Sequence, residues 1–299
     1  MIFMPELPEV ETQTRDLQKS LLGRKVIRIW TDTPKALHPS LRIFQTELVG
    51  KKIVRVTRRA KYILIELENL IWVTHFRMTG HFLVRQSGVP REKFVRHIFY
   101  LDNGLELRLE DIRKFGEMSL IYSKKQSRTL WEQPGSDPVF PIWRESEQVW
   151  KKLNQLGPEP LDKGFTLLKF KTILKGKKGS LKQKLMDQNL VAGIGNIYAD
   201  EICFESKLHP LSRLEKLSLT QIKKLHEVIR QVLKRGIQYR GTTIGEFVDT
   251  KGRPGGFQNL VQAYGRKGKP CLCCGTLLKR IVVGQRGTVF CPKCQKLAS

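Results

Sequence analysis

The amino-terminal part of the chain changes from a helical to a strand-like hydrophobic pattern. Val10, Leu17 and Leu21 recur at helical spacing, and Gly23 stands where a C-cap would lie, which predicts a helix that begins near Pro8. Short runs rich in Val, Ile, Phe and Tyr follow, and several alternate with a period of two between turn signals. They predict strands at residues 25–30, 52–58, 62–68, 72–76, 81–85, 97–101, 106–109 and 118–122.

The second half of the chain is mainly helical in pattern. Two stretches containing Pro and Gly, within residues 133–161, enclose a helical pattern around residues 147–156. Further helical patterns follow at residues 167–174, 181–186, 197–206 and 219–235. We therefore expect an α+β protein whose amino-terminal strands form an antiparallel β-sandwich or barrel, with a sandwich favoured. The expected parts are a β-sandwich with flanking helices at residues 1–134, a linker at 135–161, a helical domain at 162–265 and a small terminal unit at 266–299.

The charge of the chain points to an anionic partner. Lys and Arg number 54 against 28 Asp and Glu, which leaves a net charge of +26. Basic side chains displace counterions from a phosphate backbone, so a nucleic acid is the expected partner. A membrane is not expected, because no run of about 18 apolar residues is present. Glu6, Glu9 and Glu11 interrupt any signal-peptide pattern, so a cytoplasmic location is expected.

Four of the six cysteines are spaced like metal ligands. Two Cys-x-x-Cys pairs stand 16 residues apart and predict a closed, structural zinc site made of Cys271, Cys274, Cys291 and Cys294. Cys273 is expected to stay outside this site, because a single intervening residue suits tetrahedral chelation poorly. The segment between the pairs predicts a β-hairpin that carries Arg286, either against DNA or in solvent.

A proline close to the amino terminus is a candidate nucleophile. Proline as a first residue is a secondary amine, which can condense with a sugar carbon at the aldehyde level to give a cationic iminium. Met4 precedes Pro5, and a Met ahead of a small residue is readily trimmed, so we expect the working chain to begin at Pro5. Glu6 and Glu9 are then the nearest candidate proton carriers. The alternative is that Pro5 and Pro8 only start the first helix.

Four motifs, taken in order along the chain, resemble one protein family. They are ProGluLeuProGluValGluThr at 5–12, AspIleArgLysPheGly at 111–116, AspGlnAsnLeuValAlaGlyIleGlyAsnIleTyrAlaAspGlu at 187–201, and the terminal cysteine pairs. From Met4 to nearly the last residue, the chain is similar to the bacterial formamidopyrimidine-DNA glycosylases, which are 8-oxoguanine DNA glycosylases and AP lyases. The resemblance implies a monomeric, nucleoid-associated repair enzyme that acts on double-stranded DNA containing an oxidised base. It also implies a helix-two-turns-helix element, one structural zinc ion and no redox cofactor.

The resemblance assigns the catalytic residues. Pro5 matches the nucleophile that attacks C1′ of the damaged nucleotide, and Glu6 matches the general acid/base beside the sugar. Lys61 matches a lysine on a hairpin turn, where a fixed cation can hold phosphate and stabilise charge as the base departs. Residues 241–257 are rich in glycine and correspond to a loop that closes over the flipped purine; without the resemblance, a surface connection would be as good an interpretation.

The resemblance also assigns DNA contacts. Met78, Arg113 and Phe115 match the trio that fills the hole left by the flipped lesion, and so offset part of the stacking energy lost. The phosphate contacts are His75, Asn196, Tyr264 and Arg286. Asn196 follows GlyIleGly at the start of a predicted helix, where free N–H groups are expected to donate to a phosphate.

Two other functions remain open from the sequence. An enzyme of the endonuclease VIII type shares the terminal motifs but prefers oxidised pyrimidines, although Met78 and the motif at 111–116 favour the purine branch. A DNA-binding protein without catalysis would result if the residues before Pro5 stayed attached.

Overall fold

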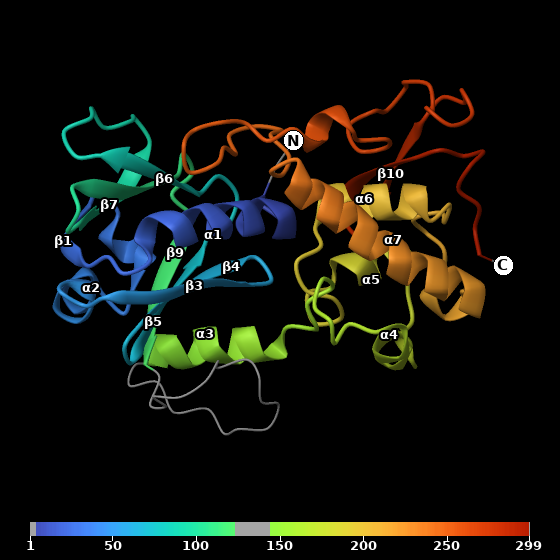
Figure 1. Ribbon diagram of the computed structural model, residues 1–299. Coiled ribbons are helices and arrows are strands. Elements are labelled where there is room, and N and C mark those ends of the chain that lie inside the picture. Colours follow the sequence, from blue (N-terminus) through green and yellow to red (C-terminus); the bar gives the residue numbers. More distant parts are fainter. Residues whose placement is uncertain (1–3, 123–143, 299) are drawn as a thin grey trace. The chain divides into compact units, whose positions relative to one another are not determined.

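The computed structural model describes residues 4–122 and 144–298, which form two compact units (Figure 1). The sandwich unit contains the described residues among 4–5, 9–155 and 243–255. The helical unit contains residues 6–8, 156–242 and 256–298. Residues 135–143 of the expected linker lie outside the described residues. None of the helices in the described part of the chain is long and apolar enough to cross a membrane.

The sandwich unit is built from two β-sheets. All neighbouring strands are antiparallel except β2 and β9, which are parallel. The four-stranded sheet has the order β1 (Val26–Thr31), β7 (Val95–Leu101), β8 (Leu105–Glu110) and β6 (His81–Gln86). The five-stranded sheet has the order β2 (Leu37–His38), β9 (Glu117–Tyr122), β5 (Leu70–His75), β4 (Tyr62–Leu67) and β3 (Ile53–Arg59).

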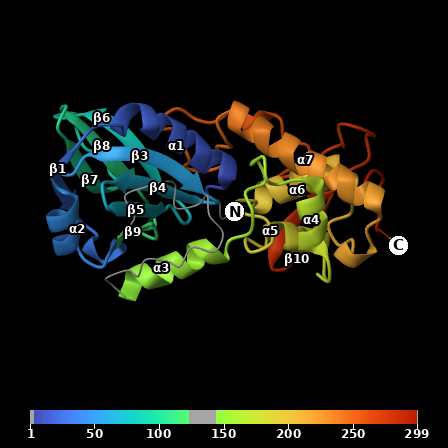
Figure 2. The ribbon, with the colours of Figure 1, turned by 60° about the horizontal axis from the view of Figure 1, so that its bottom comes forward.

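The alternating apolar positions of both sheets form one core. Trp72 of β5 lies at its centre, where Phe44 and Phe82 meet the indole edge-on and Phe99 packs 4.2 Å from it, centroid to centroid. Helix α1 (Leu7–Leu21) adds buried leucines to the same core, and α3 (Arg144–Gln155) packs against β9 (Figure 1, Figure 2). The expected α+β fold with an amino-terminal β-sandwich is therefore confirmed.

Two elements of the sandwich unit were not predicted. Helix α2 (Leu41–Leu48) is capped by the hydroxyl of Ser40 and buries Phe44 and Leu48. Its apolar residues recur at helical spacing after the capping serine, so the local signals of this helix were present in the sequence. Strand β2 consists of two residues and exists only because it pairs with β9, which the local sequence cannot indicate.

The helical unit contains the predicted helices and the terminal hairpin. Its elements are α4 (Leu167–Leu174), α5 (Leu181–Met186), α6 (Asn196–Glu205), α7 (Leu219–Gln238), β10 (Lys279–Val283) and β11 (Arg286–Phe290). Helix α6 is buried along its length and lies between α5, α7 and β11. Ser218 caps the long helix α7 in a capping box with Gln221.

The middle of the glycine-rich loop belongs to the sandwich unit. The backbone N–H of Val84 donates to the carbonyl of Thr250 at 2.8 Å, and the amide of Gln13 donates to the carbonyl of Val248 at the same distance. The Asp249 carboxylate accepts the backbone N–H groups of Lys251 and Arg253, both at 2.9 Å. These bonds give the loop an ordered turn that is attached to α1 and β6 in this structure.

Candidate functional site

The carboxylate of Glu6 occupies the amino terminus of α6. It accepts the backbone N–H groups of Gly195 at 2.7 Å, Ile197 at 2.9 Å and Tyr198 at 3.4 Å. The positive end of a helix dipole stabilises negative charge at this position. A Cβ on Gly195 would collide with the Glu6 carboxyl group, which explains why glycine stands there. Glu6 is thus fixed by main-chain groups of a segment far away in the sequence.

This arrangement corrects one expectation about α6. Three N–H groups of the segment that was expected to donate to a phosphate already donate to the Glu6 carboxylate. None of these three N–H groups belongs to Asn196 itself. The Asn196 amide donates weakly to the carbonyl of Gly287, at 3.5 Å, and its Oδ1 has no hydrogen-bond partner among the described residues.

Four of the expected site residues meet in the helical unit. Burial raises the pKa of Tyr264 to about 12, and the negative charge of Glu6 adds to this shift. A hydrogen bond from Asn196 and the positive charge of Arg286 oppose it. Glu6, Asn196 and Arg286 therefore all lie within electrostatic reach of Tyr264, although they come from separate segments of the chain.

Two buried acids and a buried lysine hold this cluster in place. Asp200 of α6 pairs with Lys182 of α5 at 2.7 Å and accepts the backbone N–H of Val289 at 3.0 Å. The Lys182 ammonium also donates to the carbonyl of Gly287 and the hydroxyl of Thr288. The hairpin that carries Arg286 is thereby attached to both helices. Burial raises the pKa of Asp200 to about 6.

Glu201 fixes the segment that carries Tyr264. Its carboxylate accepts three successive backbone N–H groups, those of Gln262, Ala263 and Tyr264, at 2.8–2.9 Å. Burial raises the pKa of Glu201 to about 7. The positioning roles of Asp200 and Glu201 were not predicted. The only signal in the sequence was an adjacent acidic pair inside an apolar helix.

In the sandwich unit, Lys61 and His75 lie close together at the end of the β4–β5 pair. Lys61 is buried and follows Ala60, which has a φ of +50°, in the β3–β4 turn. Burial, together with the positive charges of Arg77, Lys61 and Lys152, lowers the pKa of His75 to about 3. The backbone N–H of Arg77 donates to Nδ1 of His75 at 3.1 Å. His75 is therefore neutral at pH 7, with Nε2–H as its donor.

The three expected void-filling residues come from two loops that the structure joins. Met78 and Phe115 line one cavity of about 580 Å³, together with Met4, Lys35 and His38. The Arg113 guanidinium lies 4.8 Å from the centre of the Phe115 ring, and 48% of Phe115 is exposed.

Pro5 itself is buried, directly after Met4.

Asp111, which was not predicted to have a role of its own, connects the two loops. Its carboxylate accepts the hydroxyl of Thr79, the backbone N–H of Arg113 at 3.1 Å and the backbone N–H of Gly116 at 2.7 Å. Asp111 and Gly116 are both buried, so the N–H of Gly116 has no access to water as a substitute acceptor.

We expect Asp111→Asn to loosen both loops. The amide nitrogen of Asn cannot accept a hydrogen bond, so at least one buried donor loses its partner, which costs about 1–3 kcal/mol. Urea unfolding followed by circular dichroism measures the loss. Asp102→Asn is the matched control, because Asp102 is exposed in a turn and should change stability little. Equal stability of the Asp111 variant and the wild type would contradict the role given to this carboxylate.

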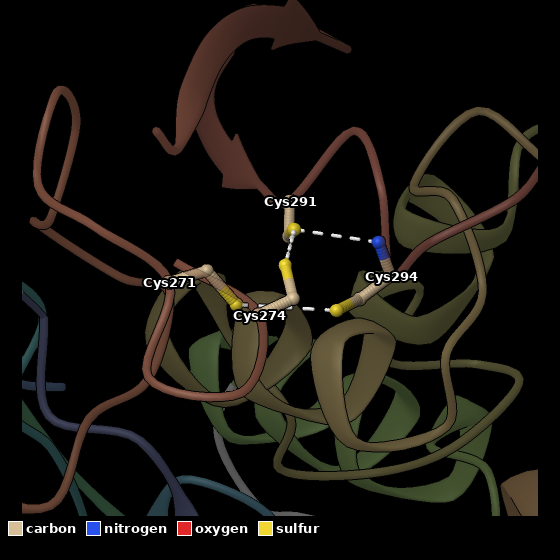
Figure 3. Close-up of side chains that lie close together, drawn as sticks. All are labelled: Cys271, Cys274, Cys291 and Cys294. Carbon is tan, nitrogen blue, oxygen red and sulfur yellow. Dashed lines mark hydrogen bonds between the residues drawn. The ribbon is translucent and has the colours of Figure 1, made fainter. Parts of the chain in front are cut away.

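The four cysteines of the two Cys-x-x-Cys pairs converge on one point (Figure 3). Their sulfurs all lie within 4.8 Å of one another, with 4.0 Å between Cys271 and Cys294 and 3.5 Å between Cys274 and Cys291. Tetrahedral zinc with bonds of about 2.3 Å requires sulfurs about 3.8 Å apart, so the four thiolates fit one structural zinc ion. Cys273 is exposed and is not part of the cluster.

Comparison with known protein families covers most of the chain. Residues 4–118 match the family described as "Formamidopyrimidine-DNA glycosylase N-terminal domain". Residues 156–248 match "Formamidopyrimidine-DNA glycosylase H2TH domain", and residues 268–297 match "Zinc finger found in FPG and IleRS". The three matched regions follow one another in the order of the sandwich, the helices α4 to α7 and the cysteine cluster.

Individual relatives match over almost their whole length. A formamidopyrimidine-DNA glycosylase of Herpetosiphon aurantiacus is 41% identical over 297 residues, covering 98% of this chain and 100% of the relative. One of Streptococcus pyogenes is 39% identical over 293 residues, covering 98% and 99%.

Solved structures agree with the sequence relatives. Wild-type Lactococcus lactis Fpg bound to DNA containing N7-benzyl-Fapy-dG is similar with a TM-score of 0.83 and 32% identity, covering 98% of this chain and 100% of that one. The same protein bound to DNA containing an oxidised pyrimidine has a TM-score of 0.82, with the same identity and coverage. By sequence, domain order and fold, this chain belongs to the formamidopyrimidine-DNA glycosylase family.

Proposed function

We propose that the chain is a bifunctional DNA glycosylase and AP lyase of base excision repair, which removes oxidised purines from double-stranded DNA. The observation that carries this proposal is the match to formamidopyrimidine-DNA glycosylases over almost the full length of the chain. The match includes the amino-terminal domain, the H2TH domain and the zinc finger. The net charge of +26 supports a nucleic-acid substrate. The enzyme acts as a monomer on the nucleoid in the cytoplasm.

The chemistry starts at the nitrogen of Pro5, once Met4 and the residues before it have been removed. The lone pair of this secondary amine attacks C1′, and the bond from C1′ to the damaged base breaks, with a proton delivered to the departing base. The nitrogen then loses its proton, and its lone pair forms an iminium with C1′ as the C1′–O4′ bond breaks and O4′ takes up a proton. Loss of a C2′ proton breaks the 3′ C–O bond, and loss of a C4′ proton then breaks the 5′ C–O bond. Successive β- and δ-elimination therefore cut the strand on both sides.

Glu6 is the proposed proton carrier for these steps. It is the residue after the nucleophile, and the N–H groups of α6 fix its carboxylate. Lys61 provides a buried cation in the β3–β4 turn, which stabilises negative charge on a phosphate or a departing base. His75 is neutral, so it binds a phosphate through its Nε2–H rather than through charge.

The remaining site residues bind and reshape the duplex. Asn196, Tyr264 and Arg286 form a polar cluster in the helical unit, which suits contacts to phosphate oxygens. Met78 and Phe115 supply apolar wedges, and Arg113 supplies a guanidinium that faces the orphaned cytosine. Filling the vacated space in this way offsets part of the few kcal/mol that base flipping costs.

The zinc ion has a structural role in this proposal. Four thiolates close its coordination shell, so no position is left for a reacting water. Cys271 and Cys291 are buried in a small core with Phe204, Leu278 and Val289. The ion thereby holds together the base of the hairpin that carries Arg286.

We expect the enzyme to cleave duplexes that carry 8-oxoguanine opposite cytosine faster than duplexes that carry thymine glycol opposite adenine. Met78, Arg113 and Phe115 are the basis for this preference, and the cleavage rates of two labelled duplexes of equal sequence measure it. The undamaged duplex is the control. A clear preference for thymine glycol would assign the chain to the pyrimidine branch. This comparison is needed because the Lactococcus lactis relative has been solved with DNA that contains an oxidised pyrimidine.

A further inference from the structure

A second groove lies in the helical unit and contains none of the proposed site residues. It has a volume of about 450 Å³ and runs between the end of α4, the turn Leu214–Lys216 and the first turn of α7. Five apolar side chains and three lysines contribute most of its lining: Leu174, Leu214, Leu217, Leu219, Ile222, Lys171, Lys175 and Lys177.

The floor of the groove is apolar and rigidly held. Leu174, Leu214 and Leu217 are buried in the helical unit, so they form a fixed surface rather than mobile side chains. Leu219 begins α7 next to the capping box of Ser218, and 67% of its surface is exposed. Exposed apolar surface that adjoins a preformed groove is typical of a binding site for another molecule.

A neighbouring surface of α4 continues the same pattern. Leu168 is 74% exposed, and it lies one turn before Lys171 and Thr172 on the same face of the helix. Lys171 and Thr172 both line the groove. The apolar surface is thus extended along α4 beyond the groove itself.

The rim of the groove is positively charged. Lys171, Lys175 and Lys177 are exposed, and among the described residues they form no ion pair. The acid in the lining, Glu215, is engaged by the guanidinium of Arg213 and by the backbone N–H of Gly179. The lysine charges are therefore available to a partner.

We propose that this groove binds a short acidic segment of another protein, whose apolar side chains fill the floor while its carboxylates face the lysines. Apolar anchors in a preformed pocket supply most of the affinity at such sites, and complementary charge supplies orientation and rate of encounter. A DNA backbone matches the lysine rim but has no apolar side chains for Leu174, Leu214 and Leu219. The occupant with both properties is an acidic amphipathic peptide.

Fluorescence anisotropy of a labelled peptide tests the proposal on the full-length protein. The probe is a fluorescein-labelled dodecapeptide that alternates Asp or Glu with Leu or Phe; a second peptide with Ser in place of the apolar residues keeps the same charge. We expect saturable binding of the first peptide and at least about tenfold weaker binding of the second.

Two sets of variants locate the binding site. Reversing Lys171, Lys175 and Lys177 to Glu is expected to weaken peptide binding at least about tenfold, and Leu219→Ser is expected to weaken it as well. The matched control reverses Lys19, Lys25 and Lys52 in the sandwich unit, which are equally exposed and change the net charge by the same amount. Control binding should remain close to that of the wild type. Urea unfolding of each variant, followed by circular dichroism, checks that the variant is folded.

Three results would overturn the proposal. The first is absence of saturable binding by the acidic amphipathic peptide. The second is an equal loss of binding in the sandwich-unit control, which would mean non-specific attraction. The third is release of the peptide by an equimolar undamaged duplex, which would assign the groove to nucleic acid. Cleavage of the lesion duplex is measured separately, so a failure of the peptide proposal leaves the repair function untouched.

Discussion

A protein that begins at Pro5 is expected to be trapped covalently on 8-oxoguanine duplex by borohydride, whereas a protein that retains Met4 is not. The free secondary amine forms an iminium with C1′, and borohydride reduces it to a stable amine. With Met4 attached, the Pro5 nitrogen is an amide and has no basic lone pair, so trapping should fall to background. Denaturing gel electrophoresis of labelled DNA measures the adduct, and intact mass identifies the first residue of each preparation.

Substitution at the same position gives a graded control. Pro5→Gly, with Gly as the first residue, leaves a primary amine that can still condense with an aldehyde-level carbon. We expect weaker but detectable trapping from this variant. Full lyase activity in a preparation shown by mass to carry Met4 would refute Pro5 as the nucleophile. Absence of any adduct from a correctly processed preparation would instead favour a DNA-binding protein without catalysis.

Replacement of Cys294 by Ser is expected to release zinc and to weaken DNA binding severely. The cysteine core of the hairpin contains few other buried side chains, and a cluster this small depends on its metal for folding. Loss of the metal frees the hairpin from its base and removes Arg286 from its position. Elemental analysis should find close to one zinc per protein in the wild type and far less in the variant, and gel shift should show at least about tenfold weaker binding to duplex.

Cys273→Ser is the matched control for the zinc site. Cys273 is exposed, lies directly beside Cys274 in sequence and is not one of the four clustered sulfurs. Its replacement should leave both zinc content and DNA binding unchanged. Undiminished zinc in the Cys294 variant, or loss of zinc in the Cys273 variant, would require a different ligand set.

The sequence predicted those features that depend on local periodicity. The eight strands predicted from the period-two pattern match β1 and β3 to β9 within about two residues at either end. Helices α4 and α5 have the predicted bounds, and the cysteine spacing identified the zinc ligands. In each of these cases the determining residues are close together in the chain.

Contacts between distant segments could not be predicted in the same way. The bond from Gly195 to Glu6 joins residues that are 189 positions apart, and nothing in either local pattern indicates it. The bond from Thr79 to Asp111 and the pair of Lys182 with Asp200 are similar cases, because a buried charge has to find its partners in the folded chain. The roles proposed for Pro5, Lys61 and the phosphate contacts remain predictions that the experiments above address.

The distance along the chain between Glu6 and Gly195 sets a minimum delay, during protein synthesis, before these two residues can form their hydrogen bond. At about 5–20 residues per second, a ribosome needs roughly 10–40 s to make the intervening segment, so the start of the chain waits that long for its partner on α6. Pro5 is buried in the folded protein. We therefore expect trimming up to Pro5 to be fastest during this interval, before the neighbouring Glu6 is bonded to the amino terminus of α6.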